Sequence, residues 1–297
     1  MSEDSKDFLP HLRDDIILGP PLRAGSTTVY YLKDKFTNCF YRIGTKEHFL
    51  LERMDGSRSL RALSDAYAAE FGRALNGRSW AGLLTLLEKR QLLENTANVT
   101  RLEELKREVD RRKRRENRGF LRRRFPLMQP DSFLEKLLPY FQFMFQRAFV
   151  LPALLCIVSL EVFVGFHISA LVADAWAARS SSWNYLLFVL CVWSFTIIHE
   201  LAHGLACKNF GGSVSEIGLI WRYFVIFPYC KLDDVLLFHK RWHRVYASFA
   251  GIFVNFLSVI PFALFWILAP VPSLLHAISA LMLLSFNITI FIRVCPS

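Results

Sequence analysis

The chain has 297 residues, a formal net charge of +10 and 53% hydrophobic residues, and these averages describe two different regions. Residues 1–130 are mixed and charged, whereas the chain from Phe149 onward is dominated by Leu, Ile, Val, Phe and Ala. The six cysteines are scattered without a CxxC pair, which argues against a disulfide framework and against a zinc ribbon. The acidic start has no apolar segment, so no cleavable signal peptide is expected.

After a short tail (residues 1–13), residues 14–97 are expected to form a small α+β domain. The stretches "DDIILGPPL", "TTVYYLKDK" and "NCFYRIG" have the β-rich or alternating patterns of a short antiparallel meander. Helical spacing follows, with Thr45 as the expected N-cap and a turn at Asp55-Gly56. The stretch "WAGLLTLLEKRQLLE" predicts a further helix, and its final Leu-Leu pair is expected to close the core.

The order of these elements, with "FYRIGTKEHFLLERMDGSRSLRALSDAY" followed by "LLTLLEKRQLLE", resembles the PqqD-like winged-helix fold. That resemblance implies a peptide-recognition domain, in which a precursor peptide adds as a strand to an exposed sheet edge. The edge is expected near Tyr30 and Tyr31 or near Phe40 and Tyr41. The alternative is a winged-helix domain used only for packing or dimerisation.

A strongly basic segment, residues 98–147, is expected to join this domain to the apolar half. Its stretch 101–124 carries twelve Lys and Arg against five Asp and Glu. We expect a helical linker that rests on the anionic headgroups of a lipid bilayer. Nucleic-acid binding is the less favoured interpretation, because the sequence shows no folded basic module around the stretch, and nucleic acid is not an expected partner.

Four apolar runs are each long enough to cross a bilayer: residues 149–172, 185–207, 245–269 and 272–293. The predicted fold class is therefore a multi-span α-helical membrane protein, with about four transmembrane helices, preceded by a small α+β winged-helix-like domain. The basic residues that flank the spans, including "HKRWHR" at 239–244, predict a cytoplasmic N-terminal domain. The expected location is a bacterial-type inner or cell membrane.

The second run contains the motif HExxH, formed by His199, Glu200 and His203. On a helix, residues i and i+4 project from one face, so both imidazoles can bind one Zn²⁺. Zinc held in this way needs a third protein ligand and activates a water molecule. Glu200 would be the general base that takes a proton from this water during attack on a peptide carbonyl. Ionisable groups inside an apolar span also need compensation, which favours a functional site over packing histidines.

The stretch "HELAHGLACKNFGGSVSEIGL" resembles the zinc helix of the site-2 protease family of intramembrane metalloproteases, in particular its branch of peptide zinc metalloproteases. The likeness continues through "FPYCKLDDVLLFHKRWHRVYASFAGIFVNFLSV", where Ala250-Gly251 and Asn255 match the "AG…N" of that branch. It covers about residues 140–290, and that branch can also carry a PqqD-like module. The resemblance implies that residues 148–297 form a transmembrane metalloprotease-like domain.

The third zinc ligand of that family is an aspartate in an "N-x-x-P…-D-G" segment, and here the sequence departs from the pattern. In "FNITIFIRVCPS", Asn287 matches the asparagine, Ile290 replaces the proline, and Cys295 with Pro296 stands in place of Asp-Gly. The domain is therefore expected to be C-terminally incomplete, to belong to a member that no longer cleaves, or to use another ligand. Cys295, Asp233 and Asp234 are the candidates for that ligand.

These expectations together predict a membrane-embedded zinc metalloprotease homologue. It would hydrolyse peptide bonds of a precursor or membrane-associated peptide that the N-terminal domain recruits. The alternative is a catalytically inactive membrane component of a peptide maturation or export system, which binds peptide without cleaving it. The expected partners are a peptide or membrane-protein substrate and the bilayer, and peptide-modifying or export proteins are further candidates.

Overall fold

A computed structural model of the chain describes residues 8–116, 122–222 and 225–294. The chain divides into two compact units. The first comprises Met1–Phe120 with Leu236–His239, and the second comprises Leu121–Val235 with Lys240–Ser297.

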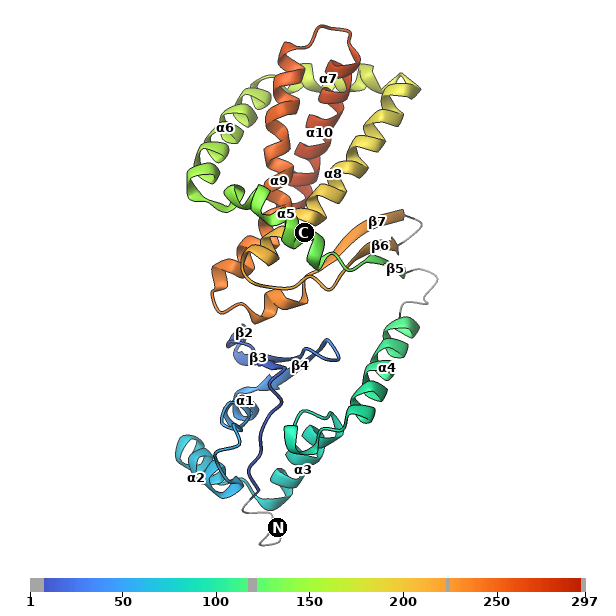
Figure 1. The fold of residues 1–297 in the computed structure, drawn as a ribbon. Helices are drawn as coiled ribbons and strands as arrows, with labels where there is room; N and C mark the ends of the chain where they lie inside the picture. Colours follow the sequence, from blue (N-terminus) through green and yellow to red (C-terminus); the bar gives the residue numbers. More distant parts are fainter. Residues whose placement is uncertain (1–7, 117–121, 223–224, 295–297) are drawn as a thin grey trace. The chain divides into compact units, whose positions relative to one another are not determined.

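The first unit is a small α+β structure built on one antiparallel sheet (Figure 1). Its elements in chain order are β1 (Ile16–Leu18), β2 (Leu22–Ala24), β3 (Thr27–Asp34), β4 (Cys39–Gly44), α1 (Thr45–Leu51), α2 (Leu60–Phe71), α3 (Gly77–Lys89), η2 (Glu94–Thr96) and α4 (Val99–Glu116). The long strand β3 pairs with β1 and β2 along one side and with β4 along the other. The first predicted strand is thus two strands, because Gly19, Pro20 and Pro21 interrupt it and proline has no N–H for the ladder.

Of the two sheet edges predicted for peptide binding, the one at Tyr30 and Tyr31 is wrong. Both residues lie in the central strand β3, paired with Ile43 and Arg42 of β4, and the Tyr31 carbonyl also accepts the N–H of Gly19 at 2.7 Å. Phe40 and Tyr41 lie in β4, which pairs only with β3 among the strands of the described residues.

The helices of the first unit cover a core of leucines and one tryptophan. Leu32 of β3, Leu63 of α2 and Trp80 of α3 are each at most 2% exposed. Leu92 and Leu93 are each 2% exposed, so the prediction that a Leu-Leu pair closes this core is confirmed. Thr45 is not an N-cap, because Gly44 occupies that position and the helix starts at Thr45 itself.

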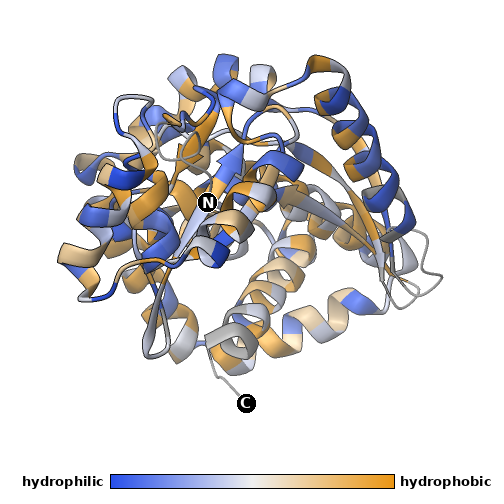
Figure 2. Ribbon diagram, turned by 90° about the horizontal axis from the view of Figure 1, so that it is seen from below, coloured by the Kyte–Doolittle hydropathy of each residue, from blue (hydrophilic) through white to orange (hydrophobic). Residues whose placement is uncertain are grey.

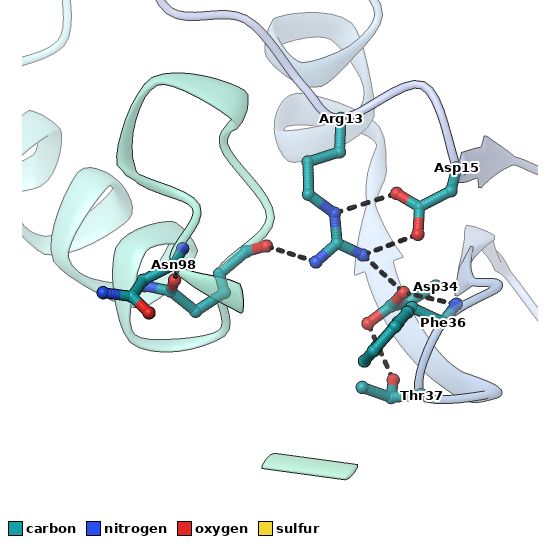
Figure 3. A network of polar contacts seen from close by, with 7 residues as sticks. Arg13, Asp15, Asp34, Phe36, Thr37 and Asn98 are labelled. Carbon is teal, nitrogen blue, oxygen red and sulfur yellow. Dashed lines mark hydrogen bonds and ion pairs between the residues drawn. The ribbon is translucent and has the colours of Figure 1, made fainter. Parts of the chain in front are cut away.

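A buried polar network ties the N-terminal segment to the sheet (Figure 3). The guanidinium of Arg13 donates to Asp15 and to Asp34, with a distance of 2.6 Å from Nη2 to Asp34 Oδ1, and also to the carbonyl of Gln91 at 2.8 Å. Asp34 is fully buried and also accepts hydrogen bonds from the Phe36 backbone and the Thr37 hydroxyl. A buried carboxylate needs such partners, because its desolvation is otherwise costly.

The second unit is a helical bundle with a three-stranded sheet at one end of α8 (Figure 1). Its elements in chain order are β5 (Arg122–Met128), α5 (Asp131–Phe141), η3 (Gln142–Phe145), α6 (Arg147–Phe166), α7 (Ile168–Arg179), α8 (Ser182–Asn209), β6 (Glu216–Arg222), β7 (Val225–Lys231), α9 (Arg241–Leu268) and α10 (Leu274–Val294). A short helix, η4 (Asp233–Leu237), follows β7.

Three helices, α6, α8 and α9, are long and apolar enough to cross a membrane. The hydropathy colouring of the ribbon shows mostly hydrophobic helical stretches beside others that are rich in hydrophilic residues (Figure 2). The three long helices correspond to three of the four predicted spans. The fourth predicted span falls on α10, a 21-residue helix whose segment Leu274–Thr289 is apolar. The first span ends at Phe166 rather than at residue 172, and a separate helix, α7, begins at Ile168 and extends beyond the predicted end of the span to Arg179. The backbone turns at His167, and α7 then packs on the bundle through Leu171, Ala175 and Ala178.

The basic segment is only partly the helix that was predicted. Residues 99–116 are helical as α4, but residues 122–128 form the strand β5, which pairs antiparallel with β6. The prediction missed β5 because its partner strand lies about 90–100 residues further along the chain, where no local pattern indicates the pairing. The hairpin of β6 and β7 was also not predicted.

Candidate metal centre

The helix α8 carries the HExxH motif and brings its two imidazoles together. His199 is buried, and its ring packs edge-on against that of His203, with the ring centroids 4.8 Å apart. The Nε2 atoms of the two rings face each other at 3.2 Å. Two nitrogens that share one tetrahedral zinc ion at 2.0–2.1 Å would lie about 3.3 Å apart. The observed separation therefore fits a shared cation, and it also fits a proton shared between the rings.

A backbone carbonyl of the neighbouring helix fixes the proton of His203. Its Nδ1 lies 2.7 Å from the carbonyl oxygen of Ala247 in α9. Because a carbonyl can only accept, Nδ1 carries the proton, and the neutral ring then presents a lone pair at Nε2. Second-shell carbonyls hold zinc-binding histidines in the same way, fixing both the tautomer and the ring orientation. His203 is thus oriented as a metal ligand through Nε2.

Gly251 of α9 forms the floor beneath both rings. A Cβ atom at this position would lie 2.5 Å from Nε2 of His199 and 2.5 Å from Nε2 of His203. A side chain of any size would therefore collide with both nitrogens at once. The absence of a Cβ therefore lets α9 approach α8 closely at the two histidines.

Glu200 points from α8 toward the edge of the three-stranded sheet. Its Oε2 accepts the backbone N–H of Cys230 at 2.9 Å. Cys230 belongs to β7, an end strand in the order β5-β6-β7, so a group outside the sheet can accept its N–H. The hairpin thereby fixes the position of one carboxylate oxygen of Glu200.

Cys230 itself is held as a neutral thiol. Burial raises the pKa of this thiol, and the neighbouring Glu200 carboxylate and Cys207 raise it further. The sulfur of Cys230 lies 3.4 Å from the position that a Cβ on Gly204 would take, so it packs against the helix one turn beyond Glu200.

Of the predicted third ligands, Asp233 and Asp234 make other contacts. Asp233 pairs with Lys231 at 2.8 Å, and Asp234 accepts the backbone N–H of Ser213 at 2.9 Å and its hydroxyl at 2.5 Å. Cys295 lies outside the described residues. Within the described part of the chain, no group of three or more His, Cys, Asp or Glu side chains is arranged to hold a metal ion. His199 and His203 therefore fit two of the ligand positions of a zinc ion, and the described residues supply no third.

Several contributors to the site were not predicted from the sequence. The Ala247 carbonyl and the Cys230 N–H are backbone groups, which carry no sequence signature. Gly251 was noted only as part of a matching pattern, and its contact with the histidines was not foreseen. A glycine in the interior of a long apolar helix is a signal in its own right, because it costs helix stability and often marks a close approach.

Comparisons with models of known protein families, with curated proteins and with solved structures give no match for this chain.

Proposed function

We propose that the chain is an integral membrane, zinc-dependent metalloprotease homologue that hydrolyses peptide bonds of a precursor or membrane-associated peptide. The observation that carries this proposal is the convergence of the two Nε2 atoms at 3.2 Å, with the His203 tautomer fixed by the Ala247 carbonyl. The residues His199, Glu200 and His203 are those of a zinc peptidase motif, so geometry and residue types support the same chemistry.

The membrane location is supported by the exposure of the apolar helices. Only 17%, 11% and 28% of the most apolar parts of α6, α8 and α9 is buried by protein. On α6, Leu151, Leu155, Val158 and Val162 follow one another at helical spacing and are each more than half exposed. Such a continuous apolar stripe is unfavourable in water and is suited to lipid.

The charges at the helix ends support a cytoplasmic N-terminal unit. Arg147 begins α6, Lys208 lies in the last turn of α8, and Lys240 and Arg241 lie at the start of α9. The consecutive spans α8 and α9 pack against each other, so the end of one and the start of the next lie at one face of the bundle. Basic residues collect on the cytoplasmic side of membrane proteins.

In the proposed reaction, a zinc ion would supply Lewis-acid activation of the peptide carbonyl and of a water molecule. His199 and His203 would hold it through Nε2. The Glu200 carboxylate, anchored at one oxygen by the Cys230 N–H, would receive the proton of the attacking water and deliver it to the leaving amine. A third protein ligand would come from outside the described residues.

Peptide recruitment is assigned to the first unit. The edge strand β4, which contains Phe40 and Tyr41, offers backbone groups to an added strand. The Tyr41 ring is covered on one side by Arg90, whose guanidinium carbon lies 4.3 Å from the ring centroid. A basic residue beside an aromatic edge favours an acidic or aromatic peptide at this position.

The experiment is a measurement of zinc in the detergent-purified chain by mass spectrometry, followed by a peptide-cleavage assay. We expect about one zinc per chain, its loss in His199→Ala, and its retention in His167→Ala, a histidine at the end of α6 that the motif does not include. Glu200→Gln should retain zinc and lose cleavage. An intact chain without stoichiometric zinc would refute the proposal, and bound zinc without cleavage would support the non-cleaving alternative.

A further inference from the structure

The helix α5 lies beside the zinc helix and is anchored to it at two points. Asp131, at its start, pairs through Oδ2 with Lys208 of α8 at 3.0 Å and accepts the Val214 N–H at 2.9 Å. Leu134 is fully buried, and its Cδ1 lies 2.8 Å from the position that a Cβ on Gly204 would take. These contacts hold α5 at the level of Gly204, one residue beyond His203, at the end of α8 that leads into the sheet (Figure 1).

The remaining surface of α5 is divided into an aromatic side and a polar side. Phe133 and Tyr140 are 46% and 75% exposed, and they lie within about 20° of each other around a helix that turns 100° per residue. Phe141, which lies between this side and the buried Leu134, is 38% exposed. Glu135, on the polar side, lies about 140° from Tyr140 around the helix axis and is also exposed.

The chain runs from this aromatic side directly into the first candidate span. Phe143, in the short helix η3 after α5, is 47% exposed, and its ring packs edge-on against Phe149 in the first turns of α6, with the centroids 4.9 Å apart. In the sequence, Arg147 lies between Phe143 and Phe149. Lys136 lies on the same side of α5 as Tyr140. Aromatic and basic residues together at the end of a span are typical of the boundary between lipid headgroups and acyl chains.

We propose that α5 is an in-plane interfacial helix, whose aromatic side, formed by Phe133, Tyr140, Phe141 and Phe143, contacts the headgroup boundary of the lipid bilayer. An amphipathic helix with aromatic residues on one side and charged residues on another binds membranes in this orientation. The continuity of this side with α6 favours lipid over a protein partner. The inference rests on the proposed membrane location and is independent of the zinc site.

The test is photocrosslinking of the full chain in nanodiscs of phosphatidylethanolamine and phosphatidylglycerol. Benzoyl-phenylalanine is placed singly at Tyr140, at Glu135 as the matched control on the polar side of the same helix, and at Leu155 in the middle of α6. Adducts with phospholipid are then measured by mass spectrometry. We expect lipid adducts at positions 140 and 155, with at least about five-fold less at position 135.

Each other outcome overturns the inference in a different way. Adducts at position 155 but none at 140 would leave the membrane location standing and refute the interfacial helix. A crosslink from position 140 to another part of the chain or to a second copy would show that protein covers the aromatic side. No lipid adduct at position 155 would refute the membrane location and the interfacial helix together, whatever the zinc content.

Discussion

Replacement of Gly251 by alanine is the sharpest test of the candidate metal centre, because it changes a residue that is not itself a ligand. The added methyl group would lie 2.5 Å from both Nε2 atoms, whereas ordinary van der Waals contact begins near 3.4 Å. The two rings and α9 must therefore separate by about 0.9 Å. Zinc–ligand distances in well-formed sites lie within about 0.2 Å of their usual values, which is much less than this separation.

The expected result is a loss of zinc with little loss of fold. Crowding of this kind costs about 1–3 kcal/mol, and alanine is favoured over glycine in a helix by about 0.5–1 kcal/mol, so the net destabilisation is about 0–2.5 kcal/mol. Zinc affinity should fall by at least about 100-fold, since changes in the outer shell of a zinc site alone reduce affinity 10–100-fold.

The assay is competition of the detergent-purified variant with a chelator of known zinc affinity, with helix content followed by circular dichroism. Gly165→Ala in α6 is the matched control, because a Cβ there meets nothing within 4 Å, and it should bind zinc as the wild type does. A Gly251→Ala chain that keeps wild-type zinc affinity would show that α9 does not form the floor of the site, and the reasoning would fail.

Two further predictions concern the first unit, and hydrogen exchange of β3 and α2 amides in the intact chain can test both. Arg13→Met should destabilise this unit by about 3 kcal/mol, because the fully buried Asp34 loses its ion pair. Arg101→Met, which breaks an exposed pair with Glu104, should leave the stability nearly unchanged. Equal effects of the two substitutions would contradict this. Burial lowers the pKa of His48, which stacks on Tyr30 with ring centroids 3.9 Å apart. A lowered pKa favours the neutral ring in the folded state. The contribution of His48 to the stability of this unit should therefore be fully present above pH 6.5 and be lost as the pH falls through the lower folded-state pKa. In His48→Phe this part of the pH dependence should disappear, and its persistence would assign it to other groups.

The sequence was informative wherever one residue pattern determines one local structure. The i, i+4 spacing of His199 and His203 was enough to place two imidazoles on one helix face, because the helical period alone brings them together. Uninterrupted apolar runs located α6, α8 and α9, because run length and hydrophobicity are local properties of the sequence. In the first unit, helical periodicity and the Leu92-Leu93 pair identified the core.

Tertiary contacts decided the rest, because they join segments whose partners are far apart in the chain. The pairing of β5 with β6 joins residues about 90 positions apart, and it places the sheet whose strand β7 orients Glu200. The packing of α9 against α8 determines which nitrogen of His203 is protonated, through the Ala247 carbonyl, and brings Gly251 against both rings. Residue types and spacing alone thus determined that two histidines and a carboxylate share one helix. Only the packing of a second helix and a sheet edge against that helix decided how their atoms are oriented for chemistry.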